Sequence, residues 1–243
     1  MEVGDERASG QGDRGARRAR PLEALERVDA TIVSGGGFFA LKGLARDAAP
    51  RRMTAWLHEQ RSSVQPYGAP DQRTMFTPAA SPSRSSTARW WPSGWLPRTV
   101  SRGHQMHTPW DPLHRAYFNG EALWTYLATP FLLAMPGVRV EEIAPWRERE
   151  ETWRVLRAWF PGAIETHSAV QDFFFGEDFL LRRHDYDVNI AGGFGASQIV
   201  LDPVRADGIV LPARRRAYLR GPDRRPVHEM LMVSIDISDV RFV

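Results

Sequence analysis

The feature that most constrains this chain is a succession of short β-like runs from residue 51 onward. Turn residues separate these runs at close intervals. In the clearest run, residues 229–243, apolar and mostly polar side chains alternate; the apolar set is Leu231, Val233, Ile235 and Ile237. A period of two places one set of side chains on a core and the other in water. Comparable strands are predicted over residues 51–60, 151–161, 197–204 and 208–221, with a hairpin over residues 169–189. Strands at this spacing favour an antiparallel sheet.

One long helix is predicted between the strands. Thr108 is a suitable N-cap, Pro109 suits the first helical position, and Asp111 completes a variant of the capping box. Pro130 ends the helix. Apolar side chains recur at helical spacing: Trp110, Leu113, Tyr117, Trp124, Leu127 and Phe131. The expected fold is therefore mainly β (α+β), a curved antiparallel sheet that forms a half-barrel or barrel and is closed by a helix over residues 109–128.

The composition excludes several classes of protein. The chain has no cysteine, which removes disulfides, thiolate metal ligands and cysteine nucleophiles. No apolar run is long enough to span a bilayer, and residues 1–21 lack the apolar segment of a secretory signal. We therefore expect a disordered tail over residues 1–21, a single β-rich domain over residues 22–243, and a cytoplasmic location.

The formal net charge of +3 suggests nucleic-acid binding, but the distribution of charge argues against it. Residues 22–77 carry a net charge of +1 and residues 105–243 a net charge of −3. Much of the basic character lies between these segments. No nucleic-acid partner is predicted.

Residues 79–103 differ in composition from the rest of the chain, because they contain tryptophan, serine, proline and arginine but no acidic residue. Only Lys42 among the 32 basic residues is lysine, which is typical of a GC-rich gene. A shifted reading frame in such DNA stays open and gives this composition. Our hypothesis is that residues 79–103 are a frameshift product that replaces a β-hairpin. The alternatives are a disordered linker and an aromatic stacking segment for single-stranded nucleic acid.

Several stretches carry a family resemblance: "TPWDPLHRAYFNGEALWTYLATPFLL", "FPGAIETHSAVQDFFFGEDFLLRRHDYDVNIAGG", "RRRAY" and "SIDISDV". They resemble an uncharacterised bacterial protein family of GC-rich, actinobacterial type. The order of elements is also loosely similar to that of LolA-like lipoprotein carriers, whose curved antiparallel sheet wraps a helix and holds an acyl chain. This resemblance implies a fold more than a function.

The histidines are the candidates for chemistry. His104, His107 and His114 have a spacing that occurs often by chance, so no metal site is predicted. The predicted hairpin brings His167 and His184 toward one end of the sheet. Either ring could act as a general base with Asp185 orienting it, or both rings could be structural groups satisfied by hydrogen bonds at the sheet rim.

A ligand site is predicted in the concave face of the sheet. Arg182, His184 and Tyr186 share one face of a strand and could hold a polar head group, while Tyr117, Trp124 and Trp153 would line an apolar cavity. The leading hypothesis is binding of a hydrophobic small molecule or acyl chain. The alternatives are a small-molecule enzyme using His/Asp acid–base chemistry and an interaction module. Neither a hydrolase serine motif nor a dinucleotide glycine motif is present, so no cofactor is expected.

Overall fold

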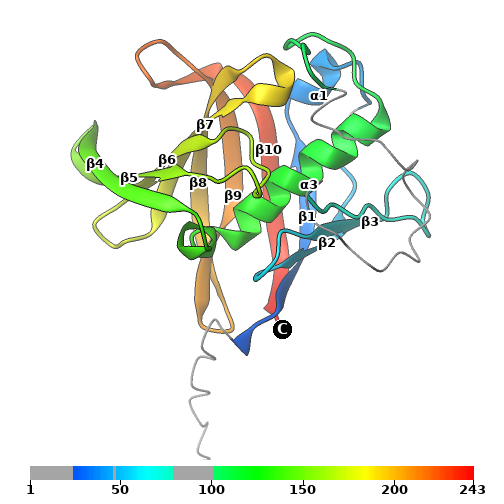
Figure 1. Ribbon diagram of the computed structural model, residues 1–243, viewed down its shortest axis with the longest axis horizontal. Coiled ribbons are helices and arrows are strands. Elements are labelled where there is room, and N and C mark those ends of the chain that lie inside the picture. The colour runs from blue at the N-terminus through cyan, green and yellow to red at the C-terminus, as the bar shows by residue number, and fades with distance from the viewer. Residues whose placement is uncertain (1–23, 46–47, 79–100) are drawn as a thin grey trace, which may run out of the picture.

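The computed structural model describes residues 24–45, 48–78 and 101–243 (Figure 1). The predicted tail over residues 1–21 and residues 79–100 of the proposed frameshift segment lie outside the described residues. Ten strands form one antiparallel sheet in the order β3-β2-β1-β10-β9-β8-β7-β6-β5-β4. Their bounds are β1 Arg27–Gly35, β2 Arg51–Trp56, β3 Ser62–Gln65, β4 Arg139–Glu148, β5 Glu151–Trp159, β6 Val170–Phe175, β7 Leu181–Val188, β8 Phe194–Ala206, β9 Ile209–Arg220 and β10 Pro226–Phe242.

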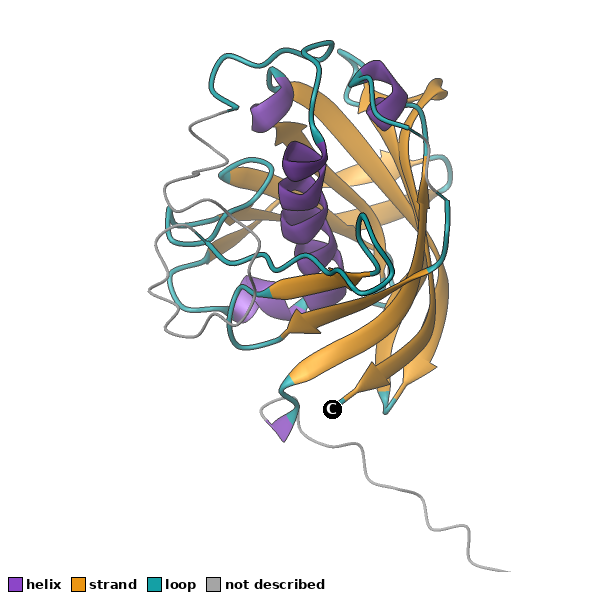
Figure 2. Cartoon of the chain, turned by 90° about the vertical axis from the view of Figure 1, so that its right-hand side faces the viewer, coloured by secondary structure: helices purple, strands orange, loops and turns teal. Residues whose placement is uncertain are grey.

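The sheet is an open half-barrel around one long helix. Helix α3 (Pro112–Ala128) lies on the concave side of the sheet and crosses several of its strands (Figures 1 and 2). Strands β3 and β4 are the two ends of the sheet and do not pair with each other. The other helical elements of the described ranges are α1 Phe38–Leu41, η2 Phe131–Ala134 and η3 Asn189–Ala191. The predicted mainly β fold is confirmed, in its open form. No helix in the described ranges is long and apolar enough to cross a membrane.

The start of the long helix differs from the prediction. Asp111 is the N-cap, and its Oδ1 accepts hydrogen bonds from the backbone N–H groups of Leu113 and His114 at 2.8 and 2.9 Å. Pro112 occupies the first helical position. The predicted cap Thr108 is wrong, because its hydroxyl accepts from the N–H of Gln105 at 2.8 Å and so belongs to the preceding turn. Pro109 and Pro112 both suit the first position of a helix. The hydrogen bonds to Asp111 place the start of α3 at Pro112.

The helix is buried on every side rather than along one stripe. All residues from Arg115 to Ala128 are buried. The sheet covers one side, and the chain after β3 covers another, where Phe76 packs against Gly120. The Ser62 hydroxyl also donates to the Gly120 carbonyl at 2.9 Å. Gly120 therefore allows α3 to lie close to β3 and to the chain that follows it.

Most strands occupy the predicted segments. β2, β5, the β6–β7 hairpin, β8, β9 and β10 fall within or around them. β1, β3 and β4 were not predicted. β3 has only four residues, β4 is an edge strand with mainly exposed side chains, and the alternation of β1 is interrupted at a register shift between Asp29 and Thr31.

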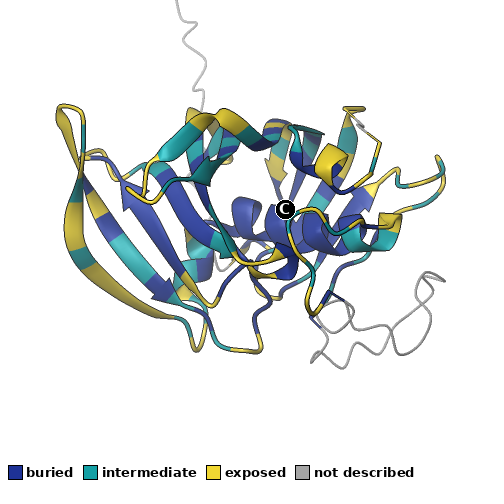
Figure 3. Ribbon diagram, turned by 90° about the horizontal axis from the view of Figure 1, so that it is seen from above, coloured by how far each residue is buried: buried dark blue, intermediate teal, exposed yellow. Residues whose placement is uncertain are grey.

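The main core lies between the concave face and α3, and a smaller cluster lies on the outer face. Figure 3 shows buried residues along the helix and the central strands, and exposed residues along the outer edge of the sheet. The smaller cluster consists of Trp153, Val155 and Phe174, with Ile143 and Trp146 packed against it. Both faces of the sheet around β5 and β6 are therefore buried, whereas an antiparallel sheet commonly has one face on the core and the other in water.

Candidate functional site

The side chains of β7 point alternately to the two faces of the sheet, and most are buried on both. Tyr186 contacts Tyr126 of α3, and His184 stacks on Phe173 on the same inner face. Arg183 points outward and lies over the rings of Trp146 and Phe174. The inner placement of His184 and Tyr186 follows from the predicted alternation along this strand.

The structure brings the two candidate histidines together around Tyr186. The His167 ring stacks on the Tyr186 ring with a centroid distance of 4.6 Å, and the His184 ring lies 4.8 Å from Tyr186 on a tilted plane. His167 Nδ1 lies 2.9 Å from Oε1 of Glu121 on α3, and each of these side chains is 1% exposed. Neither ring nitrogen of His167 and neither carboxylate oxygen of Glu121 has a hydrogen-bond partner within the described part of the chain, so the 2.9 Å contact is a close approach without hydrogen-bond alignment.

A chain of hydrogen bonds surrounds this aromatic group. The Tyr126 and Tyr186 hydroxyls are 3.0 Å apart, and His184 Nε2 is 2.6 Å from Oε1 of Gln171. Arg215 of β9 donates to the side chain of Gln198 at 2.8 Å and to the carbonyl of Tyr126 at 2.7 Å. Arg215 therefore joins the sheet to the helix through the centre of the core.

Burial sets the protonation of this interior group. Desolvation lowers the pKa of His184 well below its usual value, and the positive charge of Arg215 adds to the effect. Burial raises the pKa of Tyr186 well above its usual value and also raises the pKa of Tyr126. It lowers the pKa of Arg215 to about 10, which leaves the guanidinium charged at neutral pH. At neutral pH, His184 and both tyrosines are therefore uncharged.

Asp185 is placed apart from both histidines. Its carboxylate lies on the outer face and accepts from Arg183 Nε at 2.7 Å and Nη2 at 2.5 Å. It cannot orient His184, because adjacent residues of a strand point to opposite faces. The acidic partner in the interior is Glu121 instead. The sequence held one signal for it, a carboxylate inside an apolar helical stripe.

The three predicted aromatic ligand contacts do not line one cavity. Tyr117 and Trp124 belong to the main core, where their polar atoms donate to Glu165 at 2.6 Å and to the Trp56 carbonyl at 2.9 Å. Trp153 lies in the smaller cluster on the outer face. Its neighbour Phe174 likewise points away from Phe173, which is in the main core.

A groove of about 110 Å³ opens where α3 ends. Its lining comes from the end of α3 and from β6 to β9: Thr129, Pro130, Phe175, Phe179, Leu180, Leu181, Arg182, Val200, Leu201, Pro203, Val210, Leu211 and Pro212. The lining is apolar except for Thr129 and Arg182. Phe179 is 69% exposed and Leu201 is 43% exposed, so the groove continues into an apolar surface.

Arg182 is the predicted ligand residue that lies at this groove. Its Nη2 donates to Asp178 at 2.6 Å across the hairpin turn, and its side chain is 31% exposed. Gly176 makes room for the guanidinium, because a Cβ at that position would lie 2.9 Å from Nη2. Arg182 is thus held beside the groove and away from His184 and Tyr186, which are sealed in the core.

The histidines before and at the start of α3 were also candidates, and two of them have local structural partners. His104 Nδ1 accepts from the Trp110 indole at 3.2 Å, and His114 Nδ1 lies 2.7 Å from the capping carboxylate of Asp111. His107 is exposed. Among the described residues, no three histidine, aspartate or glutamate side chains are grouped so as to hold a metal ion.

No protein-family model and no curated protein matches the chain. Solved structures with a similar chain trace include a LolA superfamily protein from Nitrosomonas europaea, with a TM-score of 0.47, 13% identity and coverage of 91% of this chain and 87% of that one. A DUF1329 family protein from Desulfovibrio piger has a TM-score of 0.40, 11% identity and coverage of 91% and 87%. A domain described as an outer membrane lipoprotein-sorting protein from Vibrio parahaemolyticus has a TM-score of 0.40, 11% identity and coverage of 89% and 85%. TM-scores at this level do not assign the chain to a family.

Proposed function

We propose that the protein binds an amphiphilic small molecule, with an apolar chain in the groove at the end of α3 and an anionic head beside Arg182. The observation that carries this proposal is the apolar lining of the groove with one guanidinium at its side. The ion pair between Arg182 and Asp178 is partly exposed, and such pairs contribute only about 0–1 kcal/mol. A ligand carboxylate can therefore replace Asp178 at little cost.

The size of the groove limits what it encloses. A volume of about 110 Å³ is well below the roughly 300–1,000 Å³ of pockets that bury most of a drug-sized ligand. The groove therefore encloses a short piece of hydrocarbon chain, and the rest of a longer chain would lie along Phe179 and Leu201. Each methylene buried contributes about 0.8 kcal/mol, which corresponds to about a fourfold gain in affinity.

A homologous series of ligands tests this proposal. The protein is mixed with anilinonaphthalene sulfonate, and n-alkanoates from butanoate to dodecanoate compete with the fluorescent probe. We expect affinity to rise about fourfold per methylene for the short members and then to level off as the groove fills. Affinity that does not depend on chain length would refute the proposal.

Two valine variants provide the matched control. Val210→Trp fills the groove and is expected to abolish displacement by alkanoates, because Val210 lies in the lining. Val140→Trp introduces the same ring at a valine of β4 that is 37% exposed and outside the groove, and it should bind normally. Equal binding by both variants would place the ligand elsewhere.

A second candidate is acid–base chemistry at His167. The supporting observation is the buried contact with Glu121, in which His167 Nε2 keeps no partner among the described residues. Carboxylate–imidazole pairs of this kind serve as general bases when substrate can reach the ring. Diethyl pyrocarbonate tests access: modification of His167 in the folded protein would support the enzyme, whereas modification confined to exposed histidines such as His107 and His228 would leave His167 a structural residue.

A further inference from the structure

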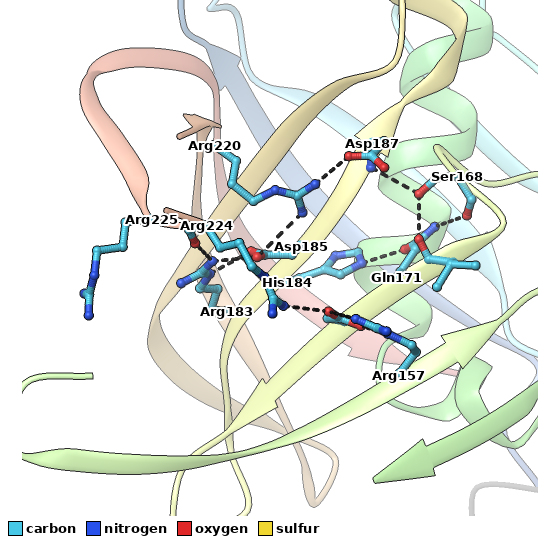
Figure 4. A network of polar contacts seen from close by, with 12 residues as sticks. Arg157, Ser168, Gln171, Arg183, His184, Asp185, Asp187, Arg220, Arg224 and Arg225 are labelled. Carbon is cyan, nitrogen blue, oxygen red and sulfur yellow. Dashed lines mark hydrogen bonds and ion pairs between the residues drawn. The ribbon is translucent and has the colours of Figure 1, made fainter. Parts of the chain in front are cut away.

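A second polar cluster lies on the outer face of β5 to β9, across the sheet from the interior histidines (Figure 4). Arg157 of β5 is bonded to Asp172 of β6 through two hydrogen bonds, at 2.7 and 2.9 Å. Arg220 of β9 donates to Asp187 of β7 at 2.5 Å. The cluster is thus built from neighbouring strands, so the hydrogen-bonded sheet fixes its geometry.

The turn between β9 and β10 folds over this face and adds another arginine. The turn is closed by hydrogen bonds between Gly221 and Arg225 at 2.8 Å and between Arg224 and Gly221 at 3.0 Å. The Arg224 carbonyl accepts a hydrogen bond from Arg183, and its guanidinium donates to Asp172 at 3.0 Å. The backbone carbonyl and the guanidinium of Arg224 therefore both anchor the turn to the strands beneath it.

Positive charge exceeds negative charge in this cluster. Its carboxylates are Asp172, Asp185 and Asp187, and its guanidiniums are Arg157, Arg183, Arg220 and Arg224. Each carboxylate already has one strongly bonded arginine of its own. The surplus charge is that of Arg224, whose side chain is 48% exposed.

The exposed arginines retain unused donors. Arg157 bonds Asp172 through Nε and Nη2, and Arg224 bonds it through Nη2 alone. Arg157 Nη1 and Arg224 Nε and Nη1 make no hydrogen bond to any residue of the described ranges. Guanidinium groups with free, parallel N–H donors bind carboxylate and phosphate groups in two-point contacts.

These donors surround a pocket rather than a flat surface. The pocket has a volume of about 350 Å³, and its charged lining consists of Arg157, Arg220 and Arg224 with the cluster's three carboxylates, Asp172, Asp185 and Asp187. Gly195 allows Arg220 to lie against β8, because a Cβ there would stand 2.9 Å from both Nε and Nη2 of Arg220. Because Gly195 has no side chain, the Arg220 guanidinium can lie against β8 and form one wall of the pocket.

We propose that this pocket binds a small oxyanion, the carboxylate or phosphate group of a soluble ligand, between Arg157, Arg220 and Arg224. The ligand supplies the negative charge that balances Arg224 and accepts from the unused guanidinium donors. The site is on the opposite face of the sheet from the groove at the end of α3, so it does not depend on the function proposed above.

Calorimetric titration with inorganic phosphate and, separately, with acetate tests the site at constant ionic strength. Binding of either anion is expected, and the stronger of the two identifies the head group. Arg224→Gln should weaken binding at least tenfold. Arg147→Gln makes the same charge change at an exposed arginine of β4 outside the pocket, and it should bind as the wild type does.

A second variant separates the pocket geometry from the net charge. Gly195→Ala keeps every charge but displaces the Arg220 guanidinium, and it should also weaken binding. No binding of either anion to the wild-type protein would overturn the proposal, as would equal losses in Arg224→Gln and Arg147→Gln. Alkanoate binding in the groove should remain intact in Arg224→Gln, so failure of one site is distinguishable from failure of the other.

Discussion

Glu121 of α3 and His167 of the loop between β5 and β6 meet inside the half-barrel, with Oε1 and Nδ1 2.9 Å apart. Both side chains are almost fully buried, and none of their four polar atoms has a hydrogen-bond partner among the described residues. This contact joins the helix to the loop between β5 and β6. A pair of hydrophobic side chains of similar volume would cost less desolvation free energy at this place.

Leucine substitutions measure this contact. Glu121→Leu and His167→Leu should each lower the free energy of unfolding, by about 1–3 kcal/mol if the side chain left behind is a neutral polar group or about 3–5 kcal/mol if it is an unpaired buried charge. The double variant should lose much less than the sum of the two. Chemical denaturation of all four proteins completes the cycle, and additive losses would mean that the two side chains do not interact.

Gly120→Ala tests the enclosure of the helix. Alanine is favoured over glycine inside a helix by about 1 kcal/mol, but overpacking a core costs about 1–3 kcal/mol. The added Cβ would lie 2.4 Å from Cβ of Phe76, so we expect net destabilisation of up to about 2 kcal/mol. Gly162→Ala is the control, because a Cβ there has no atom within 4 Å. A stabilised Gly120→Ala protein would show that Phe76 does not pack against the helix.

The corrected helix start is open to the same kind of measurement. Asp111→Ala should cost about 1 kcal/mol, because it removes two hydrogen bonds from the first turn of α3. Thr108→Ala should stay within about 0.5 kcal/mol of the wild type, since its hydroxyl serves only an exposed turn. The reverse order of the two losses in thermal or chemical unfolding would restore Thr108 as the cap.

The fold could be predicted from local patterns, because period-two alternation determines which residues face the core. β10 shows this, as Val233, Ile235 and Ile237 are all buried on the predicted face. β3 and β4 escaped prediction because one is very short and the other is an exposed edge, and neither pattern is distinctive.

The candidate site was less predictable, because it depends on what covers each face. The approach of His167 to His184 follows from the hairpin. The separation of Asp185 from the two histidines also follows from alternation. The packing of the β9–β10 turn over the outer face does not follow from any local pattern. Glu121 could be identified only once the helix was known to be enclosed on all sides, since a single carboxylate in a helix usually faces water.

Lys42, the chain's only lysine, gives the protein a specific dependence on pH. It is fully buried, its Nζ donates to the Gln105 carbonyl at 2.7 Å, and burial lowers its pKa to about 8 from 10.5. Between these values the unfolded chain holds a proton that the folded protein has released. The contribution of Lys42 to the free energy of unfolding therefore rises with pH across this window.

Comparison with Lys42→Met isolates this effect from other titrating groups. The difference in unfolding free energy, wild type minus variant, should increase from about pH 8 toward pH 10.5, by at most about 1.4 kcal/mol per pH unit. Urea denaturation at several pH values checks it. A difference that is constant or falls with pH would show that the ammonium is not desolvated.

The central claim is that the groove at the end of α3 holds the apolar part of an anionic ligand, and methyl NMR during a titration with decanoate tests it most directly. We predict that the largest shifts occur at the methyl groups of Val200, Val210 and Leu211, and that they disappear in Val210→Trp. Shifts confined to methyl groups outside the groove, such as those of Val140, or no shifts at all, would contradict the account.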